Sequence, residues 1–387
     1  MQEAIREEHL DGWLFCNFAH RDRLTDSLLE LPPDSVSSRR WFYLIPDRGQ
    51  PVKIVHSIER GILDTLPGGK TVYSGRYELA AGLSGFAGLT VAVLCDPDIQ
   101  VLSTIDAASY LLVRDCGLHP VSAAALLQRF KGIMDAAGTE SHERAARVLY
   151  RLVSDSWDLV RAAFRTGEPV SEGDIQDFML DRFKKEGLVT DHPPIVATGS
   201  HSGDPHYDVP GKPFSARGRG SFLAAGDVVQ FDLWARYPGG IFADISWVGY
   251  CGKTVPETVQ RRFGTLLRAR DLVKPAIEKA LAAGNPVTGS ELDAQVRAFL
   301  LQNVPPEAVR HRTGHGIDTD CHGSGVNLDS YEFPDTRRLL EGSCFSVEPG
   351  IYFDDAGFRT EINIYIHGGK PVISGGEIQT VLLTLQE

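Results

Sequence analysis

Residues 227–249 read DVVQFDLWARYPGGIFADISWVG, and this stretch decides the fold of the larger part of the chain. Two runs rich in β-branched and aromatic residues, 227–235 and 241–249, flank a Tyr-Pro-Gly-Gly turn signal, which predicts an antiparallel β-hairpin. Each run carries one aspartate, Asp232 or Asp244, where the pattern indicates a buried position. Aspartate is depleted in strands, and an unpaired buried carboxylate is costly, so we expect a bound divalent cation to compensate both charges.

The spacing of the two aspartates supports a shared site. The midpoint between positions 232 and 244 is 238, which is the proline of the turn. Antiparallel pairing about Pro238 would place Asp232 and Asp244 nearly opposite each other on one face of the hairpin. Like charges placed opposite each other destabilise a hairpin unless a cation lies between them.

A second hairpin repeats this arrangement with glutamates. CFSVEPGIYF (344–353) and GFRTEINIYI (357–366) predict two strands around an Asp-Asp-Ala turn. The midpoint of Glu348 and Glu361 is 354.5, inside that turn, so these glutamates should also face each other. Arg359 lies two residues before Glu361 and should point to the same face, because side chains alternate along a strand.

The segment HRTGHGIDTDCHG, residues 311–323, supplies histidines. His311, His315 and His322 lie within twelve residues, among glycines that let the backbone approach closely. His315 is the predicted fifth ligand. Cys321 is interpreted as a bystander, because no other cysteine is spaced to complete a zinc–thiolate site.

Four carboxylates and one imidazole form a hard, oxygen-rich ligand set. Such a set suits a pair of Mn, Co, Fe or Zn ions better than a structural zinc. A pair of divalent ions lowers the pKa of bound water and clamps a carbonyl oxygen. The predicted chemistry is therefore hydrolysis.

The length of 387 residues predicts two domains. Residues 1–135 alternate short apolar strands with helical patterns, which predicts a small α/β domain with a partly parallel sheet. AAGTE, at 136–140, is interpreted as part of a junction, and 140–387 as an α+β domain with an antiparallel sheet. Sequences typical of capping boxes predict helix starts, and they begin at Ser171, Thr254 and Thr288.

Composition excludes several classes of protein. The formal net charge of −12 disfavours a nucleic-acid or anionic-membrane partner, because both require a basic footprint. No run approaches the roughly 20 apolar residues of a membrane span. The mixed charges of the first residues do not form a signal peptide. Six scattered cysteines without a CxxC pair are interpreted as reduced thiols, and we expect a cytoplasmic protein.

The order Asp, Asp, His, Glu, Glu, with GHGID around the histidine and SVEPGIY around the first glutamate, resembles the pita-bread metallopeptidases of M24 type. That family includes Xaa-Pro aminopeptidases, prolidases and methionine aminopeptidases. The resemblance covers residues 140–387. Residues 1–135 are more weakly similar to the creatinase-type N-terminal domain. The resemblance implies a C-terminal pita-bread fold, two divalent metal ions, a short peptide substrate cleaved at an N-terminal Xaa-Pro bond, and a homodimer.

The resemblance also implies a role for each ligand. Asp232 would bind one metal and His315 the other. Asp244 and Glu361 would bridge both metals. Glu348 would be a ligand and would also carry the proton of the attacking water.

Other matched positions would act on the substrate side of the site. His206 resembles the histidine that contacts substrate, and His322 the histidine that steadies the tetrahedral intermediate. His311 matches a histidine of aminopeptidase P-like members. Arg359 would orient a metal ligand without binding the metal.

Three departures from the family pattern put the substrate in doubt. The two aspartates are 12 residues apart, one more than usual. His206 lies 26 residues before Asp232, which indicates an inserted loop at 211–221. Gly323 follows His322 where the family often has Glu or Asp, and it opens an unusual loop at 323–335. A metal-dependent lyase or amidase on a small non-peptide substrate remains an alternative, as does a non-catalytic binding module.

Overall fold

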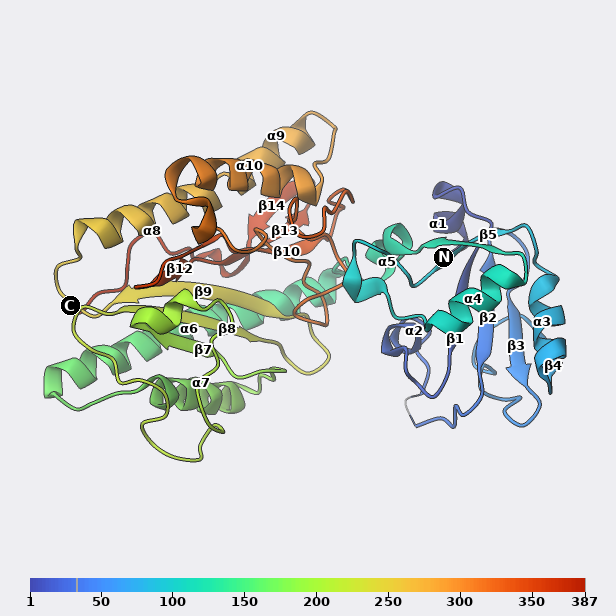
Figure 1. Ribbon diagram of the computed structural model, residues 1–387, viewed down its shortest axis with the longest axis horizontal. Helices are drawn as coiled ribbons and strands as arrows, with labels where there is room; N and C mark the ends of the chain where they lie inside the picture. The colour runs from blue at the N-terminus through green and yellow to red at the C-terminus, as the bar shows by residue number, and fades with distance from the viewer. Residues whose placement is uncertain (33, 387) are drawn as a thin grey trace. The chain divides into compact units, whose positions relative to one another are not determined.

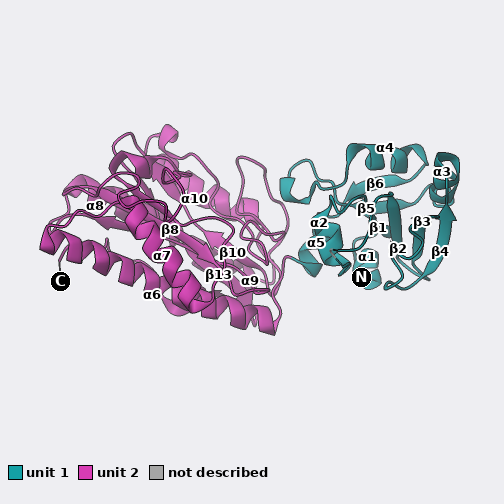
Figure 2. Cartoon of the chain, turned by 90° about the horizontal axis from the view of Figure 1, so that it is seen from below, with its two compact units in different colours: residues 1–131 teal, residues 132–387 magenta. Residues whose placement is uncertain are grey.

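The computed structural model describes residues 1–32 and 34–386. The chain forms two compact units, Met1–Lys131 and Gly132–Glu387, coloured separately in Figure 2. Residues 136–140, expected to be part of a junction, instead form the first turn of the long helix α6 (Ala136–Thr166). The Asp135 carboxylate caps this helix by accepting a hydrogen bond from the N–H of Gly138 at 2.7 Å.

Unit 1 contains a mixed six-stranded sheet in the order β4-β3-β2-β1-β5-β6. Strand β1 pairs antiparallel with β2 and parallel with β5, so the expected partly parallel sheet is confirmed. The strands are β1 (Gly12–Asn17), β2 (Trp41–Pro46), β3 (Val52–His56), β4 (Gly69–Tyr73), β5 (Thr90–Val93) and β6 (His119–Ser122). The α-helices are α1 (Gln2–Glu7), α2 (Arg23–Leu28), α3 (Arg76–Ser84), α4 (Ala107–Asp115) and α5 (Ala124–Phe130).

Unit 1 departs from its sequence pattern in two places. The pattern of residues 58–66, IERGILDTL, predicts a helix, but these residues form successive turns with i to i−3 hydrogen bonds, so that prediction is wrong. Gly61 within the segment and Pro67 after it both oppose a regular helix. Strand β4 was not predicted, because most of this edge strand is exposed and it therefore lacks an apolar pattern.

Unit 2 places antiparallel strands between two layers of helices (Figure 1). Helices α6 and α7 share one apolar core with β8 and β9. Helices α8 to α10 share a second apolar core with the strands between residues 344 and 367. The helices are α7 (Glu172–Glu186), α8 (Glu257–Arg270), α9 (Val273–Ala282) and α10 (Gly289–Asn303). The strands are β7 (Ile195–Thr198), β8 (Val228–Ala235), β9 (Ala243–Tyr250), β10 (Cys344–Val347), β11 (Gly350–Tyr352), β12 (Gly357–Arg359), β13 (Ile362–His367) and β14 (Lys370–Ile373).

The predicted β8–β9 hairpin is confirmed, but its register differs by two residues from direct opposition of the aspartates. Asp232 pairs with Ser246, and Asp244 pairs with Trp234, so the hairpin axis passes through Gly239. Gly239 has φ +75, a conformation that glycine adopts without strain. Because side chains alternate, the two aspartates still share one face as diagonal neighbours.

The second predicted hairpin has the expected register. Val347 pairs with Ile362, and Gly350 pairs with Arg359, which gives both ladders an axis at position 354.5. The sheet is interrupted between these ladders, where Glu348 and Glu361 face each other. Because of this interruption, the backbone of neither glutamate takes part in a strand ladder.

Two of the three expected capping boxes, at Ser171 and Thr288, are confirmed. The one at Thr254 is wrong, because Pro256 takes the cap position of α8. The sequence after Thr254 predicts one helix that ends near Gly284, but the structure has two helices, α8 and α9, with a break after Arg270. Pro275 explains the break, since its ring clashes with the carbonyl four residues earlier in a continuous helix. No helix among the described residues is long and apolar enough to cross a membrane.

Candidate metal centre

The five predicted ligands come together in unit 2. Three overlapping groups each offer ligand atoms that lie within 4.8 Å of one another. The groups are Asp232, Asp244 and Glu361; His315, Glu348 and Glu361; and Asp244, His315 and Cys321. Asp244, Glu361 and His315 each belong to two groups, so a single connected cluster contains all five predicted ligands.

The two hairpins are joined directly at the cluster. The Ser246 hydroxyl, directly opposite Asp232 on the first hairpin, donates a hydrogen bond to Glu361 Oε2 at 3.0 Å. The Glu361 backbone N–H also donates to the Ser246 carbonyl at 3.0 Å. This double link fixes the glutamate pair of one hairpin against the aspartate pair of the other.

The backbone of His315 is held against β10. Its N–H donates to Ser346 Oγ at 2.9 Å, and its carbonyl accepts from the Ser346 N–H at 2.9 Å. The neighbouring glycines allow this approach: a Cβ on Gly314 would lie 2.1 Å from the Ser346 carbonyl oxygen, and one on Gly316 would lie 2.6 Å from Gly325. His315 Nε2 consequently lies 3.5 Å from an Asp244 oxygen and 3.3 Å from Glu348 Oε1.

The cluster carries more buried negative charge than its protein partners compensate. Asp232, Asp244 and Glu361 are all less than a tenth exposed. Burial and neighbouring carboxylates raise the pKa of Asp232 to about 6 and raise that of Glu361 well above its usual range. Among the described residues, no group hydrogen-bonds Asp244 Oδ1 or Glu361 Oε1. Buried oxygens without a partner are costly, and a divalent cation would satisfy them. The residues therefore fit the implied pair of metal ions.

Glu348 has a different electrostatic environment. Burial raises the pKa of this carboxyl, but His315, His311 and Arg359 outweigh burial and bring the pKa below its usual range. The Glu348 side chain is 17% exposed, whereas that of His315 is 4% exposed. Glu348 is thus a charged carboxylate with access to solvent, as a proton carrier requires.

Arg359 connects the cluster to the substrate-side residues. Its guanidinium donates to Asp232 Oδ2, and also to the Tyr352 hydroxyl at 3.0 Å and the Pro205 carbonyl at 3.1 Å. The same hydroxyl lies 2.7 Å from His311 Nε2. His311 therefore reaches the cluster through Tyr352, which sequence reasoning did not single out.

The other two predicted histidines are exposed. The His322 ring lies 4.3 Å from the His315 ring, centroid to centroid, and chiefly the charge of His315 lowers the pKa of His322 to about 4. His206 follows Pro205, so its backbone lies near Arg359. Within residues 1–32 and 34–386, no side-chain contact joins the His206 imidazole to the five predicted ligands.

The unusual loops are anchored by buried acids. The Glu172 carboxylate at the start of α7 accepts hydrogen bonds from Thr198, His201, Tyr207 and Ser221, and Ser221 ends the loop 211–221. In the loop 323–335, Asp329 accepts three backbone N–H groups and Asp335 accepts that of Asn327. The capping box predicted at Ser171 pairs with Asp174, and the role of Glu172 with its four donors was not predicted.

Cys321 lies at the cluster, contrary to its interpretation as a bystander. The buried Sγ lies 3.1 Å from Asp244 Oδ2. The interpretation rested on the lack of a partner cysteine, but the neighbours of Cys321 are Asp244, 77 residues away, and His315.

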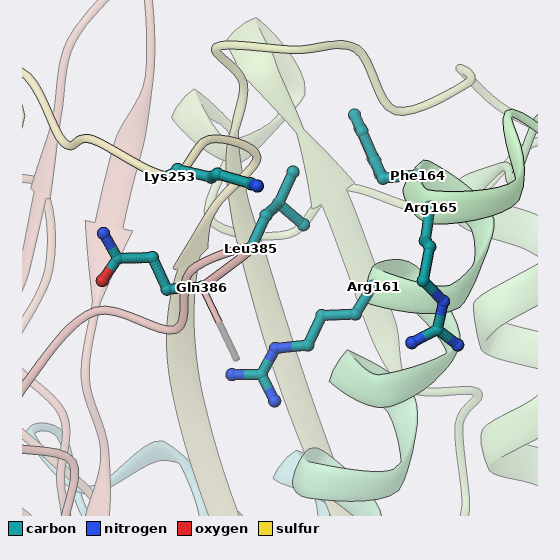
Figure 3. Close-up of a pocket in the computed structure, with 6 residues that line it drawn as sticks. All are labelled: Arg161, Phe164, Arg165, Lys253, Leu385 and Gln386. Atoms are coloured by element: carbon teal, nitrogen blue, oxygen red, sulfur yellow. The ribbon is translucent and has the colours of Figure 1, made fainter.

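A separate cavity of about 590 Å³ has the opposite chemistry. Figure 3 shows Arg161, Phe164 and Arg165 from α6 at this cavity, together with Lys253, Leu385 and Gln386. Among the described residues, three cationic side chains and no acidic side chain line it, so these residues do not suit a divalent cation. None of the predicted site residues lines it.

Comparisons with known proteins identify the family of the chain. The family model "Metallopeptidase family M24" matches residues 139–368. "Probable dipeptidase PepE" of Mycobacterium tuberculosis is 26% identical over 278 residues, which cover 72% of this chain and 65% of that protein. "Xaa-Pro dipeptidase" of Lactobacillus helveticus is 29% identical over 209 residues, 51% of this chain and 49% of its own. The chain thus aligns with about half to two thirds of the length of these relatives.

The fold has solved counterparts. The crystal structure of dipeptidase PepE from Mycobacterium ulcerans superposes with a TM-score of 0.73, covering 99% of this chain and 95% of that one. The sequences are 21% identical. At that identity the likeness shows the fold, which includes both units.

Proposed function

The chain belongs to metallopeptidase family M24, whose model matches more than half of it, and we propose that it is a dinuclear metal-dependent peptidase that cleaves N-terminal Xaa-Pro bonds. One observation carries the proposal. Four carboxylates and one imidazole form overlapping groups of three whose ligand atoms lie within 4.8 Å of one another, and two buried carboxylate oxygens in the cluster have no hydrogen-bond partner among the described residues.

The proposed ligands are Asp232, Asp244, His315, Glu348 and Glu361. Two divalent ions, of Mn, Co, Zn or Fe, would supply a Lewis acid for the scissile carbonyl and would lower the pKa of water. Asp244 and Glu361 are the best bridging candidates, because they are the two carboxylates that belong to two ligand groups and each has two oxygens to offer. Arg359 holds Asp232 in position and so acts without touching the substrate.

Glu348 is the proposed proton carrier. It is ionised and partly exposed, so it can accept a proton from the attacking water and deliver it to the leaving nitrogen. His322 is exposed beside His315, where a neutral imidazole can hydrogen-bond the developing oxyanion. His206 would hold the substrate only if its side chain turns toward the site.

The preference for a free N-terminus rests on the family resemblance. Two divalent ions would balance the four carboxylate charges of the cluster, so the charge of the site does not select the end of the peptide. The preference for proline rests on the family resemblance and on relatives such as the Lactobacillus helveticus protein, which is named a Xaa-Pro dipeptidase. No specific observation favours a lyase or amidase, and the intact ligand set does not favour a non-catalytic module.

The assembly and location of the protein are further parts of the proposal. We propose a homodimer, on the family resemblance, which sedimentation equilibrium of the purified chain tests. We propose a cytoplasmic location, because the six cysteines form no disulfide.

The function is tested by metal analysis combined with a peptide panel. The purified protein is loaded with Mn²⁺, Co²⁺ or Zn²⁺ and assayed on Xaa-Pro dipeptides, Xaa-Pro-containing longer peptides and matched Xaa-Ala peptides. The proposal predicts about two ions per chain and release of the residue before proline. Metal binding without cleavage of any peptide would refute the peptidase assignment and favour the lyase or amidase reading.

A further inference from the structure

We propose that the two metal positions are chemically unlike, and that Cys321 contributes a soft sulfur ligand to the position shared by Asp244 and His315. This inference rests on the proposed metal centre and assigns a residue beyond its five ligands. It predicts that one position prefers a thiophilic ion such as Zn²⁺ and the other a hard ion such as Mn²⁺.

The grouping of ligand atoms carries the asymmetry. Asp232, Asp244 and Glu361 form a group that offers only oxygen. Asp244 also forms a group with His315 and Cys321 that offers oxygen, nitrogen and sulfur. Cys321 Sγ and His315 Nε2 lie 3.1 Å and 3.5 Å from Asp244 Oδ2, and bonds of about 2.0–2.3 Å to a common ion can span both separations.

A second observation points to a cation at this place. Asp244 is 5% exposed, and its Oδ1 has no hydrogen-bond partner among the described residues. Its Oδ2 meets the Cys321 sulfur at 3.1 Å and His315 Nε2 at 3.5 Å. The thiol therefore donates to the carboxylate that both proposed metals would share, although Cys321 also packs in an apolar cluster.

The environment of Cys321 suits a ligand that responds to the ion present. Cys321 is 3% exposed and immediately precedes His322 in the chain. It belongs to the apolar cluster that also contains Ile317 and Phe242. A thiophilic ion would displace the thiol proton to solvent and bind the resulting thiolate. A hard ion would leave the thiol protonated and donating its hydrogen bond to Asp244.

A conservative pair of variants separates the ligand role from the hydrogen-bond role. Cys321→Ser keeps a donor that can reach Asp244 but removes the soft sulfur. The matched control is Cys251→Ser, because Cys251 is also fully buried in unit 2 but packs in the α6–α7 core. Metal affinities for Zn²⁺ and Mn²⁺ are measured by competition with a chromogenic chelator, and absorption spectra are recorded with Co²⁺ alone.

The proposal predicts a thiolate-to-cobalt charge-transfer band in the near ultraviolet for the unaltered protein and for Cys251→Ser, and its loss in Cys321→Ser. It also predicts that Cys321→Ser lowers the affinity for Zn²⁺ by at least about tenfold and leaves that for Mn²⁺ within about threefold. A missing band in the unaltered protein, or an unchanged ratio of Zn²⁺ to Mn²⁺ affinity in Cys321→Ser, would overturn the proposal. Failure of the unaltered protein to bind any of the three ions would instead overturn the metal centre itself, and with it the role of Cys321.

Discussion

We expect substitution by glutamine to have different effects on stability at two buried glutamates of unit 2. Glu361 and Glu172 are 2% and 0% exposed. Glu361 Oε1 has no partner among the described residues, whereas both oxygens of Glu172 accept two hydrogen bonds each. Replacing each with glutamine removes one formal charge at nearly constant volume, so the pair isolates the role of that charge.

Without metal, we expect Glu361→Gln to change the free energy of unfolding by less than about 1 kcal/mol. Ser246 can still donate to the amide oxygen, and the new amide N–H groups face carboxylates in place of a like charge. Glu172→Gln should cost about 1–3 kcal/mol. Whichever oxygen becomes nitrogen, the backbone N–H of Thr198 or of Ser221 loses its acceptor.

With metal, the two variants should differ in how much stability they gain. At a free Mn²⁺ concentration of 100 times the dissociation constant, binding stabilises the unaltered protein by about 2.7 kcal/mol. This corresponds to a rise in melting temperature of roughly 5–10 °C for a domain of this size. A hundredfold loss of affinity in Glu361→Gln reduces the gain to about 0.4 kcal/mol at the same metal concentration. Glu172→Gln should keep the full stabilisation by Mn²⁺, which adds to its lower free energy of unfolding without metal.

The assay is thermal and urea unfolding of the three proteins, followed by circular dichroism in EDTA and in Mn²⁺. If Glu361→Gln keeps the full metal-dependent rise in melting temperature, Glu361 is not a ligand. If Glu172→Gln loses that rise while Glu361→Gln keeps it, the placement of the metal at the carboxylate cluster is wrong.

Three further variants test other parts of the site. Glu348→Gln should keep the circular dichroism spectrum but lower kcat by about 10²- to 10⁴-fold, and unchanged turnover would exclude Glu348 as the proton carrier. Arg359→Lys should weaken metal affinity by about 10- to 100-fold, because lysine cannot keep the bonds to Asp232 and Tyr352 together; equal affinity by competition titration would contradict this positioning role. Gly316→Ala should destabilise the protein by about 1–3 kcal/mol and reduce metal binding, because the new Cβ would meet Gly325 at 2.6 Å; an unfolding midpoint equal to that of the unaltered protein would contradict the close approach.

The sequence predicted the strands of the site better than their exact pairing. Alternation along a strand places Asp232 and Asp244 on one face whatever the turn does, and the structure agrees. The register depends on where the turn reverses the chain, and Gly239, with its positive φ, moves the axis by one residue from Pro238. The second hairpin has a tight turn centred as expected, so the register of Glu348 and Glu361 was predictable.

Contacts between distant segments were not predictable from local patterns. Tyr352 reads as an ordinary strand residue, yet it joins His311 to Arg359. Cys321 was judged by the spacing of other cysteines, while its partner comes from β9. These links depend on how the loop carrying His315 packs against β10, which the flanking glycines permit but do not specify.

The most direct test of the metal centre is the metal content of the purified protein after equilibration with Mn²⁺ and dialysis, measured by inductively coupled plasma mass spectrometry. The arrangement of Asp232, Asp244, His315, Glu348 and Glu361 predicts about two manganese ions per chain. A folded protein that retains no manganese above the level of the dialysis buffer would contradict the account.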